Sequence, residues 1–348
     1  MKSLTKSAVF VVLLLALGAC PAGGLPGAGG VPGGDKVPGG MPGGGGGGLS
    51  PDSCGDYAAK GGDAGKKLKA FLDAAAMLDA KVASVEGTVK DSCITMGKEL
   101  GLDGLDGDTK TVCKKVADEI RAGLQAGLKG EAKLTVVHKP AECHVSADVA
   151  AKASAECEGK AQAEVKVTCE GTCSGTCEGK CNGACKAKNA DGSCKGQCDG
   201  TCQGSCSGDC NGHASASGSA ECQASAEVKA NFEAECKPPE VEIKYDVKLV
   251  VDKARLEKTV SAIKKGLPGL LAASARAKIA MKALVEFGKT AKDLAGSAAG
   301  LAKAFGDAAF CVAGQITAAA SAVVSVQVHV EVSVEASAEV GGACGTST

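Results

Sequence analysis

The chain has 348 residues, a formal net charge of −1, and an aromatic content of 2% with no Trp. This composition offers neither the basic surface nor the stacking side chains that nucleic-acid binding uses, and it argues against a deep aromatic-lined pocket. The sequence also has no phosphate-binding loop, nucleophile elbow or zinc-protease motif. We therefore expect no enzyme activity, no cofactor and no nucleic-acid partner.

The first twenty residues have the features of an export signal. Lys2 and Lys6 precede an apolar run over residues 8–17, which is too short to span a bilayer permanently. The run ends in the sequence LGAC at residues 17–20, which closely resembles the lipobox of bacterial lipoproteins. An ordinary secretory signal with a chance cysteine is the alternative.

The lipobox resemblance covers only these twenty residues, but it implies a location. In that family, residues 1–19 would be removed and Cys20 would be acylated, so the lipid bilayer is the expected partner. Pro21 stands where the family's inner-membrane retention signal usually has Asp. The resemblance therefore implies an outer-membrane lipoprotein that faces either the periplasm or the outside.

Residues 20–53 are rich in Gly and Pro, with VPGG and MPGG repeats and a run of six glycines. Such a segment cannot bury a core, and we expect a flexible tether with a reach of ~30 Å.

Residues 54–130 are predicted to be helical. Apolar residues recur at steps of three and four from Leu68 to Val89. A second helix is expected to begin after an Asp108 cap and to end at Gly130.

The fourteen cysteines of the next stretch are placed as mirror images, and the two residue numbers of every pair add up to 379. The pairs are Cys143 with Cys236, Cys157 with Cys222, Cys169 with Cys210, Cys173 with Cys206, Cys177 with Cys202, Cys181 with Cys198, and Cys185 with Cys194. A constant sum is typical of an antiparallel hairpin. It predicts a long hairpin over residues 131–250 with its turn near residues 189–190.

This mirror arrangement predicts disulfides between opposite cysteines. Opposite residues of an antiparallel ladder have Cα atoms ~4.5–5.5 Å apart, within the range that a disulfide needs. The even spacing of the cysteines would place all of them on one face, and export favours their oxidation. In the same register Lys180 faces Asp199 and Lys152 faces Glu227, and these charge pairs support it.

Two other interpretations of the C-x-G-x repeat stay open. A helix would also align residues four apart, although each interior Gly costs ~1 kcal/mol. A metal–thiolate cluster of the metallothionein kind would use the same cysteines, although zinc and iron–sulfur sites usually have C-x-x-C spacing.

The two ends of the predicted hairpin have an apolar face. Under the sum of 379, Tyr245 faces Leu134 and Ile243 faces Val136, which predicts a root packed against the helices. Beyond the root we expect a kink at prolines that cannot donate ladder hydrogen bonds, namely Pro140, Pro238 and Pro239. A straight arm from Cys143 to the turn would then reach ~150 Å.

Residues 251–321 are predicted to be helical, with Asp252 as a cap and another element beginning at Pro268. Heptad-like apolar steps from Leu284 to Phe305 indicate a buried helical seam. We interpret the Ala-rich residues 308–324 as core rather than as a membrane span.

Residues 322–342 alternate valine with mostly polar residues from Val324 to Val334, as in a half-buried strand. The tetrapeptide ASAE occurs there and in both halves of the predicted hairpin, at 336–339, 153–156 and 224–227. We therefore expect a third strand beside the hairpin, followed by a short tail at residues 343–348.

Two groups of potential metal ligands lie outside the fourteen symmetrically placed cysteines. The five remaining cysteines of the mature chain are an odd number, so one is expected to be free or to pair between chains: Cys54, Cys93, Cys113, Cys311 and Cys344. His138, His144 and His329 could approach one another on a sheet, but solvated strand histidines are the default, and we predict no metal site.

Together these features predict an α+β fold, in which a helical bundle packs on a small antiparallel sheet and a long disulfide-laddered β-hairpin projects from it. They favour a membrane-anchored structural or contact protein that presents a rigid ribbon at the cell envelope and can self-associate through its flat small-residue face. The alternative is a thiol-based metal-binding or redox-buffering lipoprotein.

Overall fold

The computed structural model describes residues 49–130, 134–297 and 305–345, and these lie in one unit, Gly47–Thr348. The predicted α+β class is confirmed: long helices pack together, and antiparallel sheets carry most of the cysteines. The predicted signal, Cys20 and all but the last few residues of the tether lie outside the described residues.

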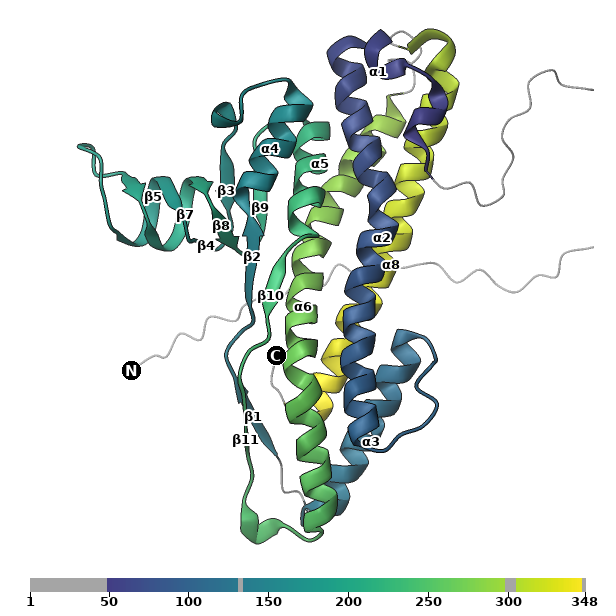
Figure 1. Cartoon of the computed structure of the whole chain (residues 1–348), viewed down its shortest axis with the longest axis vertical. Helices are drawn as coiled ribbons and strands as arrows, with labels where there is room; N and C mark the ends of the chain where they lie inside the picture. Colours follow the sequence, from purple (N-terminus) through teal and green to yellow (C-terminus); the bar gives the residue numbers. More distant parts are fainter. Residues whose placement is uncertain (1–48, 131–133, 298–304, 346–348) are drawn as a thin grey trace, which may run out of the picture. The chain divides into compact units, whose positions relative to one another are not determined.

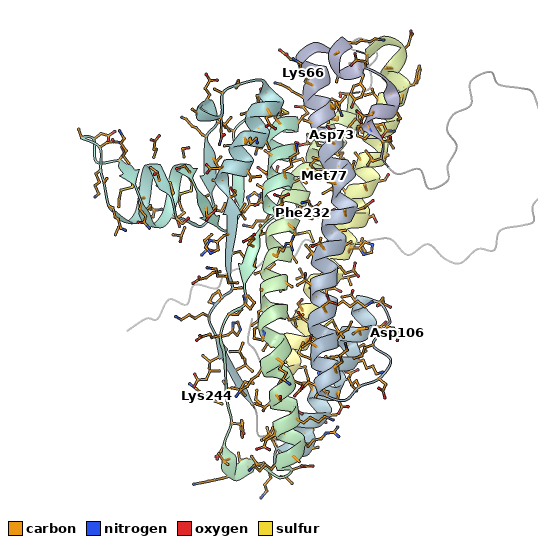
Figure 2. The ribbon with its side chains drawn as sticks, in the orientation of Figure 1. Lys66, Asp73, Met77, Asp106, Phe232 and Lys244 are labelled. Atoms are coloured by element: carbon orange, nitrogen blue, oxygen red, sulfur yellow. A yellow bond between two sulfur atoms is a disulfide. The ribbon has the colours of Figure 1, made fainter. Side chains whose placement is uncertain are left out.

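Three long helices run side by side, α2 (Gly62–Glu99), α6 (Lys253–Gly296) and α8 (Ala309–Ala343), and α3 (Thr109–Gly127) packs against all three (Figure 1; with side chains in Figure 2). The apolar stripe predicted from Leu68 to Val89 is buried in this bundle. In its core Phe71 stacks on Phe287, with ring centroids 4.1 Å apart. Short helices η1 (Pro51–Cys54) and α1 (Tyr57–Lys60) lead into α2, and η4 (Gly306–Ala308) leads into α8.

Both predicted helix caps are confirmed. The Asp108 carboxylate accepts a hydrogen bond from the Thr111 amide at 2.8 Å, and the Asp252 carboxylate accepts one from the Arg255 amide at 3.0 Å. The element boundary predicted at Pro268 is wrong, because α6 continues through it. Leu267 and Leu270 are buried on either side, and we attribute the tolerance of the lost hydrogen bond to their packing.

The third strand predicted for residues 322–342 is also wrong, because these residues belong to α8. The many valines satisfy two periodicities at once. Helical steps of three and four select Val323, Val326 and Val330 for the core, whereas Val324 and Val328 remain exposed. Packing on α2, α3 and α6 therefore overrides the strand preference of the alternating pattern.

One stretch of the described residues, Gly306–Ala343, is long and apolar enough to cross a membrane. A core helix of a water-soluble protein can pass the same test, and α8 buries a continuous seam in the bundle.

The root of the hairpin has the predicted register. Strand β1 (Thr135–His138) pairs with β11 (Val241–Lys244), with Val136 opposite Ile243. Strand β2 (Glu142–Ser146) pairs with β10 (Glu235–Lys237), with Cys143 opposite Cys236. Residues 139–141 and 238–240, which contain the three prolines, interrupt the ladder as expected. Leu134 and Val136 are buried against the helices.

The hairpin is not continuous over residues 131–250, because a helix interrupts each half. These are α4 (Ala147–Glu158) and α5 (Ala220–Asn231), which contain the ASAE sequences at 153–156 and 224–227. Both segments are rich in Ala, the strongest helix former. The Ser146 hydroxyl caps α4, and Gly159 ends it in the left-handed region at φ +66°.

Beyond the two helices the chain forms the cysteine-rich arm, defined here as residues 165–217. Short helices η2 (Gln162–Glu164) and η3 (Val247–Leu249) lie outside it. Its strands are β3 (Val167–Cys169), β4 (Thr172–Cys173), β5 (Thr176–Cys185), β6 (Cys194–Gly196), β7 (Cys198–Ser207), β8 (Asp209–Asn211) and β9 (Ala214–Ala216).

A pair of valine substitutions distinguishes a helix from a strand at residues 322–342. Val326 and Val328 would share one face of a strand, but in α8 Val326 is fully buried and Val328 is 53% exposed. Val326→Asp should therefore lower the free energy of unfolding by ~3 kcal/mol or more. Val328→Asp should change it by less than ~0.5 kcal/mol. Urea denaturation measures both, and equal effects would contradict the helix.

Candidate functional site

The cysteine-rich arm is the candidate functional site, and its disulfides join the predicted partners. Five bridges lie within the arm, with Cα separations of 5.5 to 5.9 Å. They join Cys169 to Cys210, Cys173 to Cys206, Cys177 to Cys202, Cys181 to Cys198, and Cys185 to Cys194. The other two mirror pairs, Cys143–Cys236 and Cys157–Cys222, lie at the root and between α4 and α5.

The bonded cysteines are not opposite one another in the β-ladder of the arm, which corrects the expected register. Strands β5 and β7 place Cys177 opposite Cys206, whereas its disulfide reaches Cys202, four residues away. Along its other edge β5 pairs with β6, and Cys177 lies opposite Gly196. The two chain segments therefore wind around each other instead of forming a flat ribbon (Figure 1).

Winding turns the cysteines toward the inside of the arm. Cys173, Cys177, Cys198 and Cys202 are at most 1% exposed. The small-residue face that the sequence suggested for self-association is therefore largely covered. Thr168, Thr172, Thr176 and Lys180 are exposed and contribute to a polar outer surface.

Glycine makes this close winding possible. A Cβ atom on Gly175 would lie 1.8 Å from the carbonyl oxygen of Ser207, and one on Gly204 would lie 2.1 Å from that of Glu178. No side chain fits at either position, because the partner backbone occupies the space. The Gly of the C-x-G-x repeat is thus required by the approach of the two segments.

The arm turns back at residues 189–193, close to the predicted turn. The Asn189 amide donates to the Ser193 carbonyl at 2.8 Å, and the Asp191 carboxylate accepts from the Ser193 amide at 2.9 Å. The hydrogen bonds from the Ser193 hydroxyl and amide hold the pKa of Asp191 below its usual value. Asp191 therefore stabilises the turn through local hydrogen bonds.

The charged residues whose pairing supported the flat register are not opposite one another in the ladder. Lys180 lies opposite Gln203, and Asp199 lies opposite Ala184. Lys152 forms an ion pair with Glu156 on its own helix. Because the repeat has a period of four, a register shift of four keeps Cys opposite Cys, so the cysteine positions alone did not distinguish the two registers.

Helices α4 and α5 attach the arm to the bundle. Glu158 at the end of α4 receives hydrogen bonds from the Lys67 ammonium on α2, at 2.9 Å, and from the Ser219 amide before α5. Its side chain is 7% exposed, and these donors lower the pKa of Glu158 to about 2. A second ion pair joins the arm itself to the bundle, between Lys282 of α6 and Glu170, at 2.5 Å.

A buried polar cluster completes this attachment. The Asn231 side chain accepts from the Ala214 amide at 3.0 Å and donates to the Ala214 carbonyl at 2.8 Å, so that α5 supplies a partner for β9. His213 and Glu227 lie beside it, 3.8 Å apart and almost fully buried. Burial lowers the pKa of His213, and the Glu227 carboxylate acts in the opposite direction. Sequence reasoning missed this cluster because its members come from separate segments.

The arm is also shorter than the sequence suggested. The estimate of ~150 Å assumed extended strands from Cys143 to the turn. Instead, the strands of the arm begin at Val167 and wind, while α4 and α5 lie against the bundle.

Four of the five outer cysteines form two disulfides, Cys54–Cys311 and Cys93–Cys113. Cys344 is the one described cysteine without a disulfide. It is buried, and burial raises the pKa of its thiol to about 12. The odd count is thus explained by an unreactive thiol in the core.

The three histidines considered for a metal site lie apart. His138 contacts the Lys139 carbonyl, His144 lies opposite Glu235, and the His329 ring is 2.9 Å from Glu86. Among the described residues, no group of three or more His, Cys, Asp or Glu side chains is placed to hold a metal ion.

No protein-family model, curated protein or solved structure matches this chain.

Thiol counting in paired cysteine variants tests the bridge assignment. Cys185→Ser with Cys194→Ser removes one complete bridge and should give the wild-type number of free thiols in denatured, unreduced protein. Cys157→Ser with Cys194→Ser removes half of each of two bridges and should give two more, on Cys222 and Cys185. Equal counts in the two double variants would contradict the assignment.

The Glu158 network predicts a pH-dependent stability. Its carboxylate stays ionised in the folded chain down to pH about 2, whereas its usual pKa is 4.5. Its contribution, ~1–3 kcal/mol, should be complete above pH ~5 and lost as the pH falls toward 2. Glu158→Gln should therefore destabilise the protein most at neutral pH. Urea titrations from pH 2 to 7 measure this, and a pH-independent difference would contradict it.

Proposed function

We propose that this chain is an exported, membrane-anchored structural or contact protein that presents the cysteine-rich arm at the cell envelope. The observation that carries the proposal is the series of nested disulfides inside the arm. Bridges at sequence separations of 9, 17, 25, 33 and 41 residues close it from its tip to its base.

The construction of the arm supports a mechanical role. Two paired strands without an apolar core are marginally stable in water, and the interior of the wound arm consists mainly of cystine sulfur, with glycine between the cysteines. Each bridge adds only eight residues to the loop already closed by the one nearer the tip. The native fold therefore needs little further ordering between bridges, which favours a stiff element with a polar surface.

The way in which the chain enters the bundle supports an anchored function. The described residues begin where the predicted tether ends. There the Cys54–Cys311 disulfide joins η1 to the first turn of α8, and Gln315 accepts a hydrogen bond from the Ser50 amide at 3.0 Å. A force along the tether would therefore pass into a long core helix through a covalent bond. This arrangement is useful if Cys20 is acylated, as the lipobox implies.

The disulfides also bear on the alternative of a thiol-based metal-binding or redox-buffering protein. Metal binding needs thiolates, and the fourteen mirror cysteines are all bonded in the oxidised chain. A protein purified without reductant that contained about fourteen free thiols would favour the alternative.

Photo-crosslinking in intact cells tests the contact function. A photo-reactive amino acid at position 180, in the exposed part of the arm, should form a defined crosslink to another envelope component. The same amino acid at position 285, where Val285 of α6 is 51% exposed, serves as the control and should not form it. Cys20→Ser should remove the chain from the detergent phase and abolish the crosslink.

The experiment can contradict the contact function of the arm and the lipid anchor separately. Equal crosslinking from positions 180 and 285 would argue against a contact made by the arm. A Cys20→Ser chain that remained in the detergent phase would argue against the lipid anchor.

A further inference from the structure

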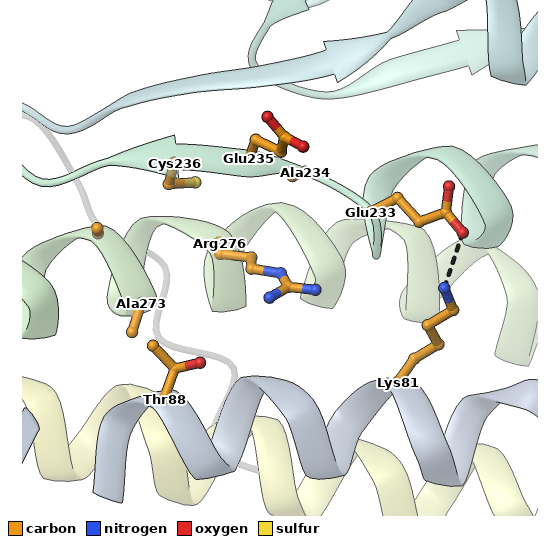
Figure 3. A pocket seen from close by; sticks show the side chains of 9 residues that line it. Lys81, Thr88, Glu233, Ala234, Glu235, Cys236, Ala273 and Arg276 are labelled. Carbon is orange, nitrogen blue, oxygen red and sulfur yellow. Dashed lines mark hydrogen bonds and ion pairs between the residues drawn. The ribbon is translucent and has the colours of Figure 1, made fainter. Parts of the chain in front are cut away.

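A cavity of about 630 Å³ lies between α2, α6 and the segment that follows α5 (Figure 3). Ala234, Ala272 and Ala273 line part of it, and their small side chains leave the space open. Cys236, which is bonded to Cys143, forms another part of the wall. The cavity is thus built from the root of the arm and from two bundle helices.

Arg276 is the polar group that sets this cavity apart. Its Nη2 donates a hydrogen bond to the Phe232 carbonyl at 2.7 Å, but its Nε is buried without a partner. A guanidinium has five N–H donors in a rigid planar fork, so most of its donors remain available. A buried donor without an acceptor is destabilising unless another group in the cavity accepts a hydrogen bond from it.

Comparison with the other arginines strengthens this observation. The chain contains three arginines. Arg121 pairs with Asp118 at 2.8 Å, and Arg255 pairs with Glu119 at 2.5 Å. In the part of the chain that the structure describes, Arg276 has no carboxylate within ion-pair distance. Burial lowers the pKa of Arg276, and the Glu233 carboxylate, which lies beyond ion-pair distance, acts in the opposite direction.

Two cations and two carboxylates line the cavity, and Arg276 is the lining cation for which the described residues supply no ion pair. Lys81 is held by Glu233 at 2.7 Å. Glu235 belongs to β10, and its carboxylate points away from the guanidinium (Figure 3). A ligand that complements this site therefore carries a single negative charge and two oxygens in a plane, because that geometry matches the guanidinium fork.

We propose that this cavity binds a small organic monocarboxylate, with the carboxylate on Arg276 and its aliphatic part against the alanines and the Cys143–Cys236 bridge. Two neighbouring glutamates disfavour a dianion such as inorganic phosphate, because it would place a second negative charge beside them.

The three arginine side chains give a direct spectroscopic test. In protein labelled with ¹⁵N-arginine, the Nε–H signal of Arg276 is the one that disappears in Arg276→Lys. Propionate should shift that signal saturably, whereas propionamide, which has nearly the same shape without the charge, should not. Sodium chloride at matched ionic strength controls for screening. Phosphate should shift the signal at least tenfold more weakly than propionate.

Two substitutions give opposite expected effects. Arg276→Gln should weaken propionate binding at least tenfold, measured through the Ala methyl signals of the cavity. Glu233→Gln releases Lys81 and should strengthen binding about threefold or more, a gain that unfolding cannot produce. Arg121→Gln, which removes a surface arginine, should leave the affinity unchanged.

Several results would overturn the proposal. They are an Arg276 signal that does not respond to propionate, equal shifts of all three arginine signals, tighter binding of phosphate than of propionate, and weaker propionate binding by Glu233→Gln.

Discussion

Covalent pairing of cysteines holds the two segments of the arm together and determines how the arm is built. The arm is too narrow to bury an apolar core, so cystine side chains fill its interior and hold its two segments together. Only glycine leaves enough room for the winding that brings the bonded cysteines within reach. The C-x-G-x repeat therefore specifies both the cross-links and the backbone approach that they need. Helices α4 and α5 and the buried cluster at Asn231 then join this covalently closed element to an ordinary helical bundle.

The disulfide pairs could be predicted from the sequence because the cysteines are placed symmetrically about the tip of the arm. Such a prediction does not depend on the strand geometry between them. Equal numbers of residues separate each cysteine from the tip on both sides, and this equality survives whether the chain between them is strand or helix. For that reason Cys157 and Cys222 are bonded although they lie in helices. The ladder register was not predictable, because shifting a four-residue repeat by four positions maps Cys onto Cys and Gly onto Gly. Only the cysteines at the two ends of the series distinguish the two registers.

The wrong predictions of helices and strands have a common cause. Residues 324–334 contain valine at every second position, so the same sequence satisfies a strand face and a helical stripe. Neighbouring helices decided the outcome, and their positions are not visible in the local pattern. The segments before Cys157 and after Cys222 are rich in Ala, and Ser146 caps the first of them. These local signs of helix were outweighed by the symmetric placement of the cysteines. The Arg276 cavity and the Glu158 network combine residues from distant segments, so no local pattern indicates them.

Mass-spectrometric mapping of the disulfides in unreduced protein distinguishes nested bridges from bridges that follow the β-ladder. Nested bridges give five bonds within the arm whose residue numbers add up to 379, with Cys185 bonded to Cys194 at the tip and Cys169 bonded to Cys210 at the base. The competing result is bonding between the cysteines that lie opposite in the ladder, such as Cys177 with Cys206 and Cys181 with Cys202. That register would leave Cys169 and Cys194 as free thiols, and finding it would contradict the nested arm described here.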